Sequence, residues 1–235
     1  EKKGSRISLY WYSTNSGPYD VGNHKIESDI GLKIMQWNHM IVWNEEQKKH
    51  WIKYCPKTHY KITGPIQFLD SDKKIGNYQS KKLLGVFDVT PTRPILYTSL
   101  GYAIPPYYST ELSFKFFSDI ASLDTGNNTI TLWKKKRIVG YDFINKGFVK
   151  KLNEQLTKKN IVPINPDIAV EKIIEKCNVV ISMPYTSVAI IAKKYQIPSI
   201  FYDASGNINT SERHGIPVLK NKDELNKWWS SLNIN

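Results

Sequence analysis

The chain has 235 residues and a formal net charge of +12, and it is 40% hydrophobic and 12% aromatic. This length and composition suffice for one large domain, or for one domain with part of a second. No apolar run is long enough for a membrane-spanning helix, two cysteines are too few for a disulfide framework, and the five histidines lack partners at zinc-ligand spacing.

The first part of the chain alternates short apolar runs with polar loops. We expect strands at 7–12, 40–43, 60–65 and 81–88, and a helix at 45–54. The polar stretch 70–80 is the best linker candidate. The chain begins at Glu1 without Met, which is typical of a piece of a longer protein. We expect residues 1–44 to be a partial N-terminal segment and residues 45–235 to be a Rossmann-like domain.

From about Ala103 onward, helical and strand patterns alternate regularly. The predicted helices are 109–123, 148–158, one starting at Asn165-Pro166-Asp167, 186–195 and a terminal helix capped by Asn221. The predicted strands are 128–133, 161–164, a run starting at Val179, a run starting at Ser199, and 215–219. Such alternation implies right-handed crossovers and a doubly wound parallel sheet, so the predicted fold class is α/β and Rossmann-like.

The segment Ser182–Ser187 is the most informative stretch, because it joins a buried strand to an apolar helix through a polar elbow. The hydroxyls of Thr186 and Ser187 lie where the helix should begin, next to free backbone N–H groups that favour a phosphate. Ser and Thr are also ordinary helix caps, so the same pattern is compatible with an elbow that binds nothing.

Several segments, taken in order, resemble the C-terminal, donor-binding half of GT-B glycosyltransferases, in particular bacterial surface-polysaccharide biosynthesis proteins. They are Val42–Gln47, Tyr60–Pro65, Val86–Pro91, Ile130–Arg137 and Cys177–Asp203. The resemblance covers the chain from Met40 to its C-terminus. It implies that residues 1–44 are an acceptor-side remnant and that residues 45–235 are a nucleotide-sugar-binding domain. The sequence lacks a His-Pro pair after the strand that ends near Trp133, in contrast to sialyl- and polysialyltransferase-like families.

The resemblance implies a nucleotide-sugar-dependent glycosyltransferase, with the donor phosphate bound at the Ser182–Ser187 elbow. The donor-binding residues it implies are Ser182, Tyr185, Thr186, Ser187, Lys134, Lys136, Arg137 and Asp203. Asp88 and Glu212 are the candidates for the catalytic carboxylate that deprotonates the acceptor. Two of these assignments have a structural alternative. The basic loop Lys134–Arg137 is also compatible with simple solvation, and an Asp at a strand end, as at Asp88 and Asp203, often caps a turn.

The positive charge favours anionic partners, and a CMP-activated acidic sugar such as Kdo is one donor class that fits it. We expect a glycan or lipid-linked acceptor of lipopolysaccharide or capsule type, a cytoplasmic location, and association with the anionic inner face of the membrane. Solvated lysine faces also explain much of the charge, and Trp228 and Trp229 suit core packing as well as a membrane surface. We expect no metal and no cofactor besides the donor.

Two other functions fit the same architecture. One is a CDP-polyol phosphotransferase of teichoic-acid type, and the other is a non-catalytic module that binds a nucleotide or another anion. A dehydrogenase and a nucleic-acid partner are not expected, because the sequence has no G-x-G-x-x-G fingerprint, no P-loop and no aromatic–basic signature of an RNA module.

Overall fold

The chain divides into two units, residues 1–68 and 69–235, which are described separately. The computed structural model describes residues 4, 6–11, 19–21, 24–26, 36–65, 74–78, 81–89, 91, 109–135, 146–156, 161–184 and 186–232.

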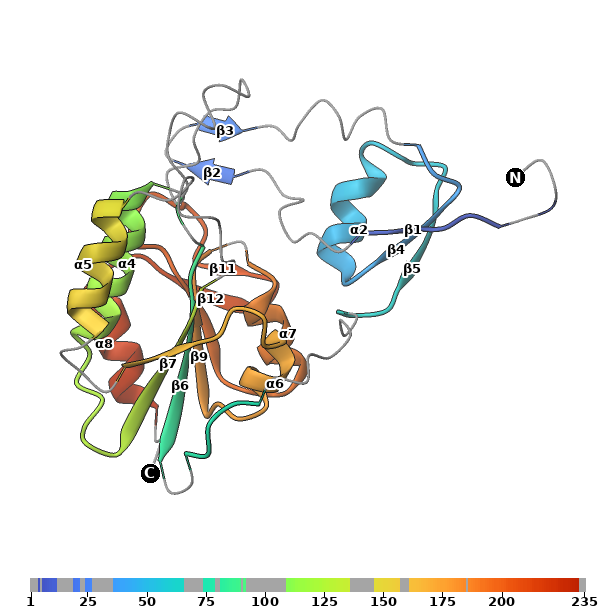
Figure 1. Ribbon diagram of the computed structural model, residues 1–235. Helices are drawn as coiled ribbons and strands as arrows, with labels where there is room; N and C mark the ends of the chain where they lie inside the picture. The colour runs from blue at the N-terminus through green and yellow to red at the C-terminus, as the bar shows by residue number, and fades with distance from the viewer. Residues whose placement is uncertain are drawn as a thin grey trace. The chain divides into compact units, whose positions relative to one another are not determined.

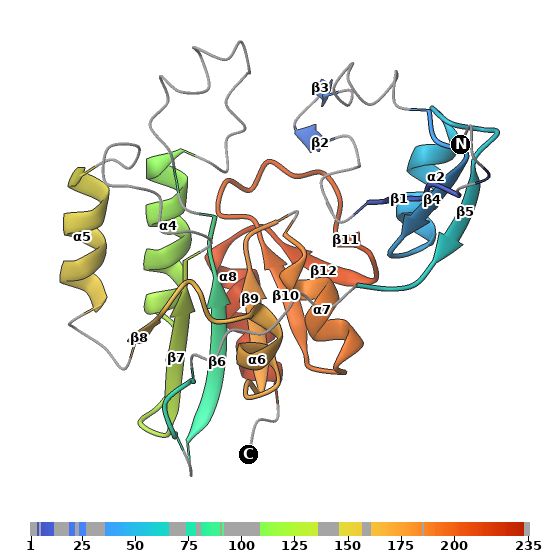
Figure 2. The same ribbon diagram turned by 45° about the vertical axis from the view of Figure 1, so that its right-hand side comes forward.

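The first unit contains a parallel three-stranded sheet with one helix against it (Figure 2). The sheet has the order β1 (Leu9–Tyr10), β4 (His39–Val42), β5 (His59–Ile62), the helix is α2 (Glu45–Ile52), and an antiparallel ribbon joins β2 (Tyr19–Val21) to β3 (His24–Ile26). Asn44 caps α2 by accepting a hydrogen bond from the Gln47 N–H. Met40 and Val42 of β4 pack with Trp51 of α2 and with Cys55 in one buried core.

This core places the division between units later than the sequence suggests. We predicted a boundary at residue 44, which falls between β4 and α2. In the structure those two elements share one hydrophobic core, and the division comes after Phe68. The physical reason is that α2 covers the apolar face of the sheet to which β4 belongs, so that cutting between them would expose both surfaces.

The second unit is a doubly wound α/β layer structure (Figure 1). In spatial order its strands are β11 (Glu212–Arg213), β12 (Ile216–Leu219), β10 (Ser199–Tyr202), β9 (Val179–Ser182), β6 (Lys82–Phe87), β7 (Thr129–Lys134) and β8 (Ile161–Ile164). All pair in parallel except β11, which is antiparallel to β12. The predicted α/β class with a parallel sheet is confirmed.

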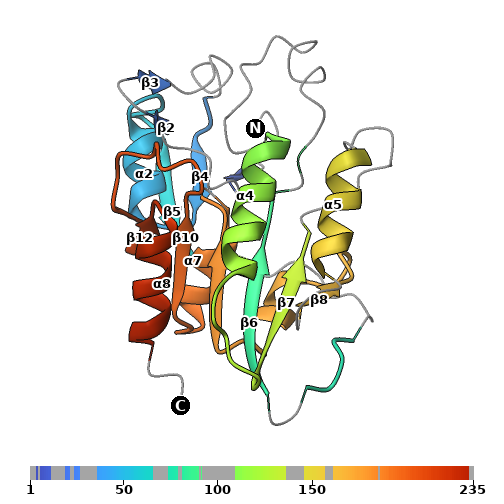
Figure 3. The ribbon, with the colours of Figure 1, turned by 90° about the vertical axis from the view of Figure 1, so that its left-hand side faces the viewer.

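Helices cover both faces of this sheet. One face carries α4 (Thr110–Ala121), α5 (Lys146–Leu156) and α8 (Lys222–Ser231), and the other carries α6 (Val170–Ile174) and α7 (Val188–Lys194), as Figures 1 and 3 show. The predicted cap of the terminal helix is confirmed, because Asn221 accepts a hydrogen bond from the Glu224 N–H. Strands β6 and β9 are buried almost throughout, as parallel strands covered on both faces must be.

No helix in the described part of the chain combines the length and the apolar character that a bilayer crossing requires.

Candidate functional site at the carboxyl edge of the sheet

The strand order creates one topological switch point, between β6 and β9. With antiparallel β11 left out, the six remaining strands can be renumbered 1 to 6 in chain order, from β6 (1) to β12 (6). In space they then lie in the order 6-5-4-1-2-3. The chain builds outward from β6 to β8, then returns to the other side of β6 and builds outward through β9. In open α/β sheets, ligands bind outside the carboxyl ends of the strands at this reversal.

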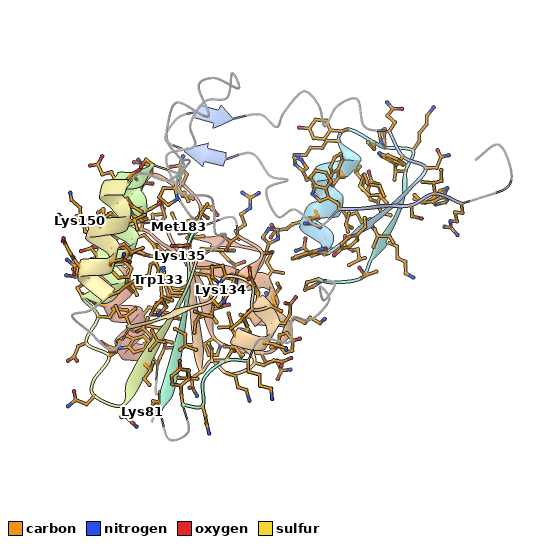
Figure 4. All side chains as sticks on the ribbon, viewed as in Figure 1. Lys81, Trp133, Lys134, Lys135, Lys150 and Met183 are labelled. Carbon is orange, nitrogen blue, oxygen red and sulfur yellow. The ribbon has the colours of Figure 1, made fainter. Side chains whose placement is uncertain are left out.

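The two strands at the switch point stay paired one residue beyond their ends. Phe87 lies opposite Ser182, and the next residue, Met183, donates its N–H to the carbonyl oxygen of Phe87 at 3.1 Å. The Val89 N–H in turn points at the Met183 sulfur at 3.3 Å. Met183 is buried, and its sulfur covers the backbone just beyond the end of β6. Figure 4 shows Met183 at this edge, with Lys135 close by in that view.

Asp88 is the first residue after β6 and is buried at this edge. Its Oδ2 accepts a hydrogen bond from the Trp133 indole N–H at 3.1 Å. That indole is held in place by two rings of α4, since its centroid lies 6.0 Å from Phe116 and 4.4 Å from Phe117. The sequence placed Asp88 correctly at a strand end, but gave no sign that Trp133 orients it.

Lys134 extends to the opposite face of the sheet from Trp133, because successive residues of a strand alternate. Its ammonium group is buried and donates to the Pro166 carbonyl oxygen at 2.9 Å. Burial lowers the pKa of Lys134, and the carboxylates of Asp88, Asp167 and Glu171 act against that shift. The Lys134 ammonium group therefore already has a hydrogen-bond partner within the protein, and its role in binding a donor phosphate stays a prediction.

The elbow has the predicted strand–turn–helix form, and its three hydroxyls differ in their burial and hydrogen bonds. The Ser182 hydroxyl is fully buried and donates to the Ile200 carbonyl oxygen at 3.4 Å, inside the sheet. Thr186 donates to the Met183 carbonyl oxygen at 3.1 Å and closes the turn. Ser187 is the N-cap residue of α7, but its side chain makes no capping hydrogen bond. Among the described residues, no side chain caps the first N–H groups of α7, and such N–H groups favour an anion.

Asp203, at the end of β10, organises its own loop. Its carboxylate accepts hydrogen bonds from the Ser205 N–H at 2.9 Å, the Ser205 hydroxyl at 2.5 Å and the Ile208 N–H at 2.9 Å. The side chain is buried. This geometry is typical of a turn-capping aspartate, so contact with a donor stays a prediction that the local structure does not favour.

Glu212 lies away from the switch point. It is exposed on β11, the edge strand, and four strand spacings separate β11 from β6. At about 4.8 Å per spacing, that separation is about 19 Å. The structure therefore does not bring the two predicted catalytic carboxylates, Asp88 and Glu212, together. The other predicted site residues, Tyr185, Lys136 and Arg137, lie outside the described residues.

A metal site is not evident in the part of the chain that the structure describes, where no three His, Cys, Asp or Glu side chains cluster. What the edge does offer is a buried carboxylate oriented by an indole, a buried ammonium group and the uncapped start of a helix.

Solved structures similar to this chain include three proteins. They are Anabaena Alr3699/HepE in complex with UDP and glucose (TM-score 0.47, 10% identity), the wall teichoic acid polymerase TagF soaked with CDPG (0.48, 12%) and TarM (0.41, 13%). Each match covers 98% of this chain, but only 62%, 59% and 44% of the three proteins respectively. This chain therefore spans less than two thirds of each of these relatives.

A search of curated protein sequences finds no match. A family model, described as polysaccharide biosynthesis PFTS motif protein, matches residues 1–229. This match confirms the resemblance to polysaccharide biosynthesis proteins inferred from the sequence. With nearly its whole length matched, the chain belongs to the family of polysaccharide biosynthesis PFTS motif proteins.

Proposed function

We propose that this chain is the donor-binding part of a glycosyltransferase that builds a surface polysaccharide. The observation that carries the proposal is the switch point between β6 and β9, with Asp88 and the start of α7 beside it. The membership of a polysaccharide biosynthesis family supports the same conclusion.

In this proposal the donor phosphate lies over the Ser182–Ser187 elbow, above Met183. The N–H groups at the start of α7 and the Ser187 hydroxyl stabilise the charge of the departing nucleotide, and Thr186 holds the turn in place through its bond to the Met183 carbonyl oxygen. The bond between the anomeric carbon and the phosphate oxygen breaks with its electrons going to the nucleotide, and the acceptor oxygen bonds to that carbon.

Asp88 is the carboxylate that we assign to the acceptor proton, because it alone of the two candidates lies at the switch point. The Trp133 indole N–H donates to its Oδ2 and so orients the carboxylate at this edge. The acceptor is a glycan or a lipid-linked sugar, and the same proposal includes action in the cytoplasm at the inner face of the membrane.

Nucleotide binding is the first test. Thermal unfolding is followed with UDP, CDP, CMP and GDP, and a nucleotide that binds should stabilise the protein by about 2.7 kcal/mol at 100 times its dissociation constant. The double variant Thr186→Ala, Ser187→Ala should weaken that nucleotide about tenfold, which corresponds to about 1.4 kcal/mol. The matched control is Thr210→Ala, Ser211→Ala, another Thr-Ser pair, on the approach to β11. Equal weakening by both double variants, or no stabilisation by any nucleotide, would contradict the proposal.

Product analysis separates the remaining alternatives. Incubation with CMP-Kdo, UDP-sugars and CDP-glycerol is followed by mass spectrometry of the released nucleotide. Glycosyl transfer from a UDP-sugar releases UDP and transfer from CMP-Kdo releases CMP, whereas polyol-phosphate transfer breaks the pyrophosphate of CDP-glycerol and releases CMP. Asp88→Asn should abolish acceptor-dependent release, and Glu212→Gln should leave it unchanged. Binding without acceptor-dependent release from any donor would favour a non-catalytic module.

A further inference from the structure

A separate cavity lies at the amino edge of the seven-stranded sheet, where the strands begin. It has a volume of about 230 Å³. Its lining includes Lys82, Gly126, Asn127, Asn128, Asn178 and Trp229. Lys81, adjacent to this edge, lies at the far end of the sheet from Met183 in Figure 4. Since β6 has six residues, the two edges are about 20 Å apart at 3.3 Å per residue.

Backbone and side-chain hydrogen bonds hold the rim of this cavity. The Asn178 side-chain oxygen accepts from the Leu83 N–H at 2.8 Å, and the Asn178 N–H donates to the Leu83 carbonyl oxygen at 2.9 Å. On the other side, the Trp229 indole N–H donates to the Asp124 carbonyl oxygen at 3.0 Å. These bonds fix the indole against the turn that precedes β7, so the cavity needs little ordering before a ligand binds.

The described lining combines planar amides, hydroxyls, one lysine and one indole with apolar side chains of β6 and β9, and it contains no carboxylate. Asn127 and Asn128 are exposed in a turn, and their amides both donate and accept hydrogen bonds. Trp229 is partly exposed and adds an aromatic surface. A sugar ring has the complementary features: hydroxyls around its rim that donate and accept, and C–H groups on its faces that pack on an aromatic ring.

Size restricts the ligand further. Sites for drug-sized ligands have volumes of about 300–1,000 Å³. This cavity is smaller, so it suits one ring and not a nucleotide sugar. It also lacks a helix N-terminus of the kind that binds a phosphate. We propose that the cavity binds a single pyranose residue of a glycan chain. The choice of a glycan rests on the proposed function, whereas the cavity and its lining do not.

A glycan bound here would be held at the amino edge of the sheet, opposite to the carboxyl edge where we propose that the donor binds. The two edges are several sugar residues apart. The site would then retain the polysaccharide, as acceptor or product, without competing with the nucleotide at the carboxyl edge.

Nuclear magnetic resonance of the full chain tests this inference directly. The probes are the methyl glycosides of glucose, N-acetylglucosamine and glucuronic acid, with UDP and CMP as comparison ligands. At least one glycoside should shift the Trp229 indole N–H and the Gly126 backbone N–H saturably, and the nucleotides should shift neither. The Gly126 signal then reports affinity in the variants.

Two variants and one matched control complete the test. Asn127→Ala, in an exposed turn, should weaken the glycoside about fivefold, the loss of one hydrogen-bonding group. Trp229→Ala should weaken it more, whereas Trp228→Ala, its neighbour outside the lining, should have no effect. Absence of a saturable shift with every glycoside, or unchanged affinity in both Asn127→Ala and Trp229→Ala, would overturn the inference. Glycoside binding without nucleotide binding would uphold it while contradicting the proposed function.

Discussion

Cys177 is a buried thiol in the sheet, and its burial makes the stability of the protein depend on pH. The thiol lies so close to β6 that a Cβ added to Gly85 would come within 2.7 Å of its sulfur. Burial raises the pKa of Cys177 from 9.0 to about 12. Below pH 9 the thiol is protonated in both the folded and the unfolded chain, and its full contribution to stability is present.

Between pH 9 and 12 the unfolded chain loses this proton first, so the stability that the thiol provides falls as pH rises. At pH 10, the free energy of unfolding of wild type should be about 1.4 kcal/mol lower than at pH 7.5 through this group alone. Urea unfolding of wild type and Cys177→Ala at both pH values measures it, because the variant lacks the group while other titrating residues cancel in the comparison. Parallel pH dependence of the two proteins would show that the thiol is not sealed from water.

Single residues also show what the sequence can and cannot predict about the site. Asp88 was placed at a strand end from the local pattern, since a strand that ends in a polar loop is visible in the sequence alone. Its partner Trp133 lies 45 residues away, and the two meet only because β6 and β7 pair in a particular register. Likewise, nothing near Glu212 in the sequence indicates that it lies on an edge strand several strands from Asp88.

At the level of helices and strands, a buried polar contact ties α4 to β10. The Tyr202 hydroxyl donates to Oδ2 of Asp119 at 2.7 Å, and the Lys115 ammonium group contacts the same oxygen from the exposed side, also at 2.7 Å. Burial, followed by the Asp119 contact, raises the pKa of Tyr202, so the phenol stays protonated and remains a donor.

Removal of this hydroxyl should loosen α4 without changing the fold. Tyr202→Phe is expected to lower the free energy of unfolding by about 1.5–3 kcal/mol, as for a hydrogen bond to a charged group. Hydrogen exchange in α4 should accelerate. Lys115→Met is the control, because its ammonium group is half exposed and an i,i+4 surface pair contributes only about 0.3–0.5 kcal/mol. A larger loss for Lys115→Met than for Tyr202→Phe would refute this assignment.

Helix and strand positions were predictable because apolar periodicity reports which face is buried. The first residues of the helices were less predictable. The predicted helix at Asn165 begins only at Val170, because the Asn165 side chain accepts from the Asp167 N–H and forms a turn. The helix predicted from Thr186 begins at Val188, because Thr186 closes a turn onto Met183. Both differences come from side chains that compete locally for backbone groups.

For the whole molecule, the separate cores of the two units have a thermodynamic consequence. The first unit is built around Met40 and Trp51, and the second around the central strands, which include Leu132. Among the described residues, the core around Met40 and Trp51 is assembled from the first unit alone, which favours separate unfolding of the two units. We therefore expect two transitions when the full chain is heated in a calorimeter.

Core truncation assigns the transitions. Met40→Ala and Leu132→Ala each remove a fully buried side chain, a change that costs about 2–5 kcal/mol. Met40→Ala should lower the temperature of one transition only, and Leu132→Ala should lower that of the other. Tryptophan fluorescence gives an independent assignment, since four of the seven tryptophans (Trp11, Trp37, Trp43 and Trp51) belong to the first unit. If both variants shifted one shared transition equally, the two units would unfold together, and the second unit could not be treated as an independent folding unit.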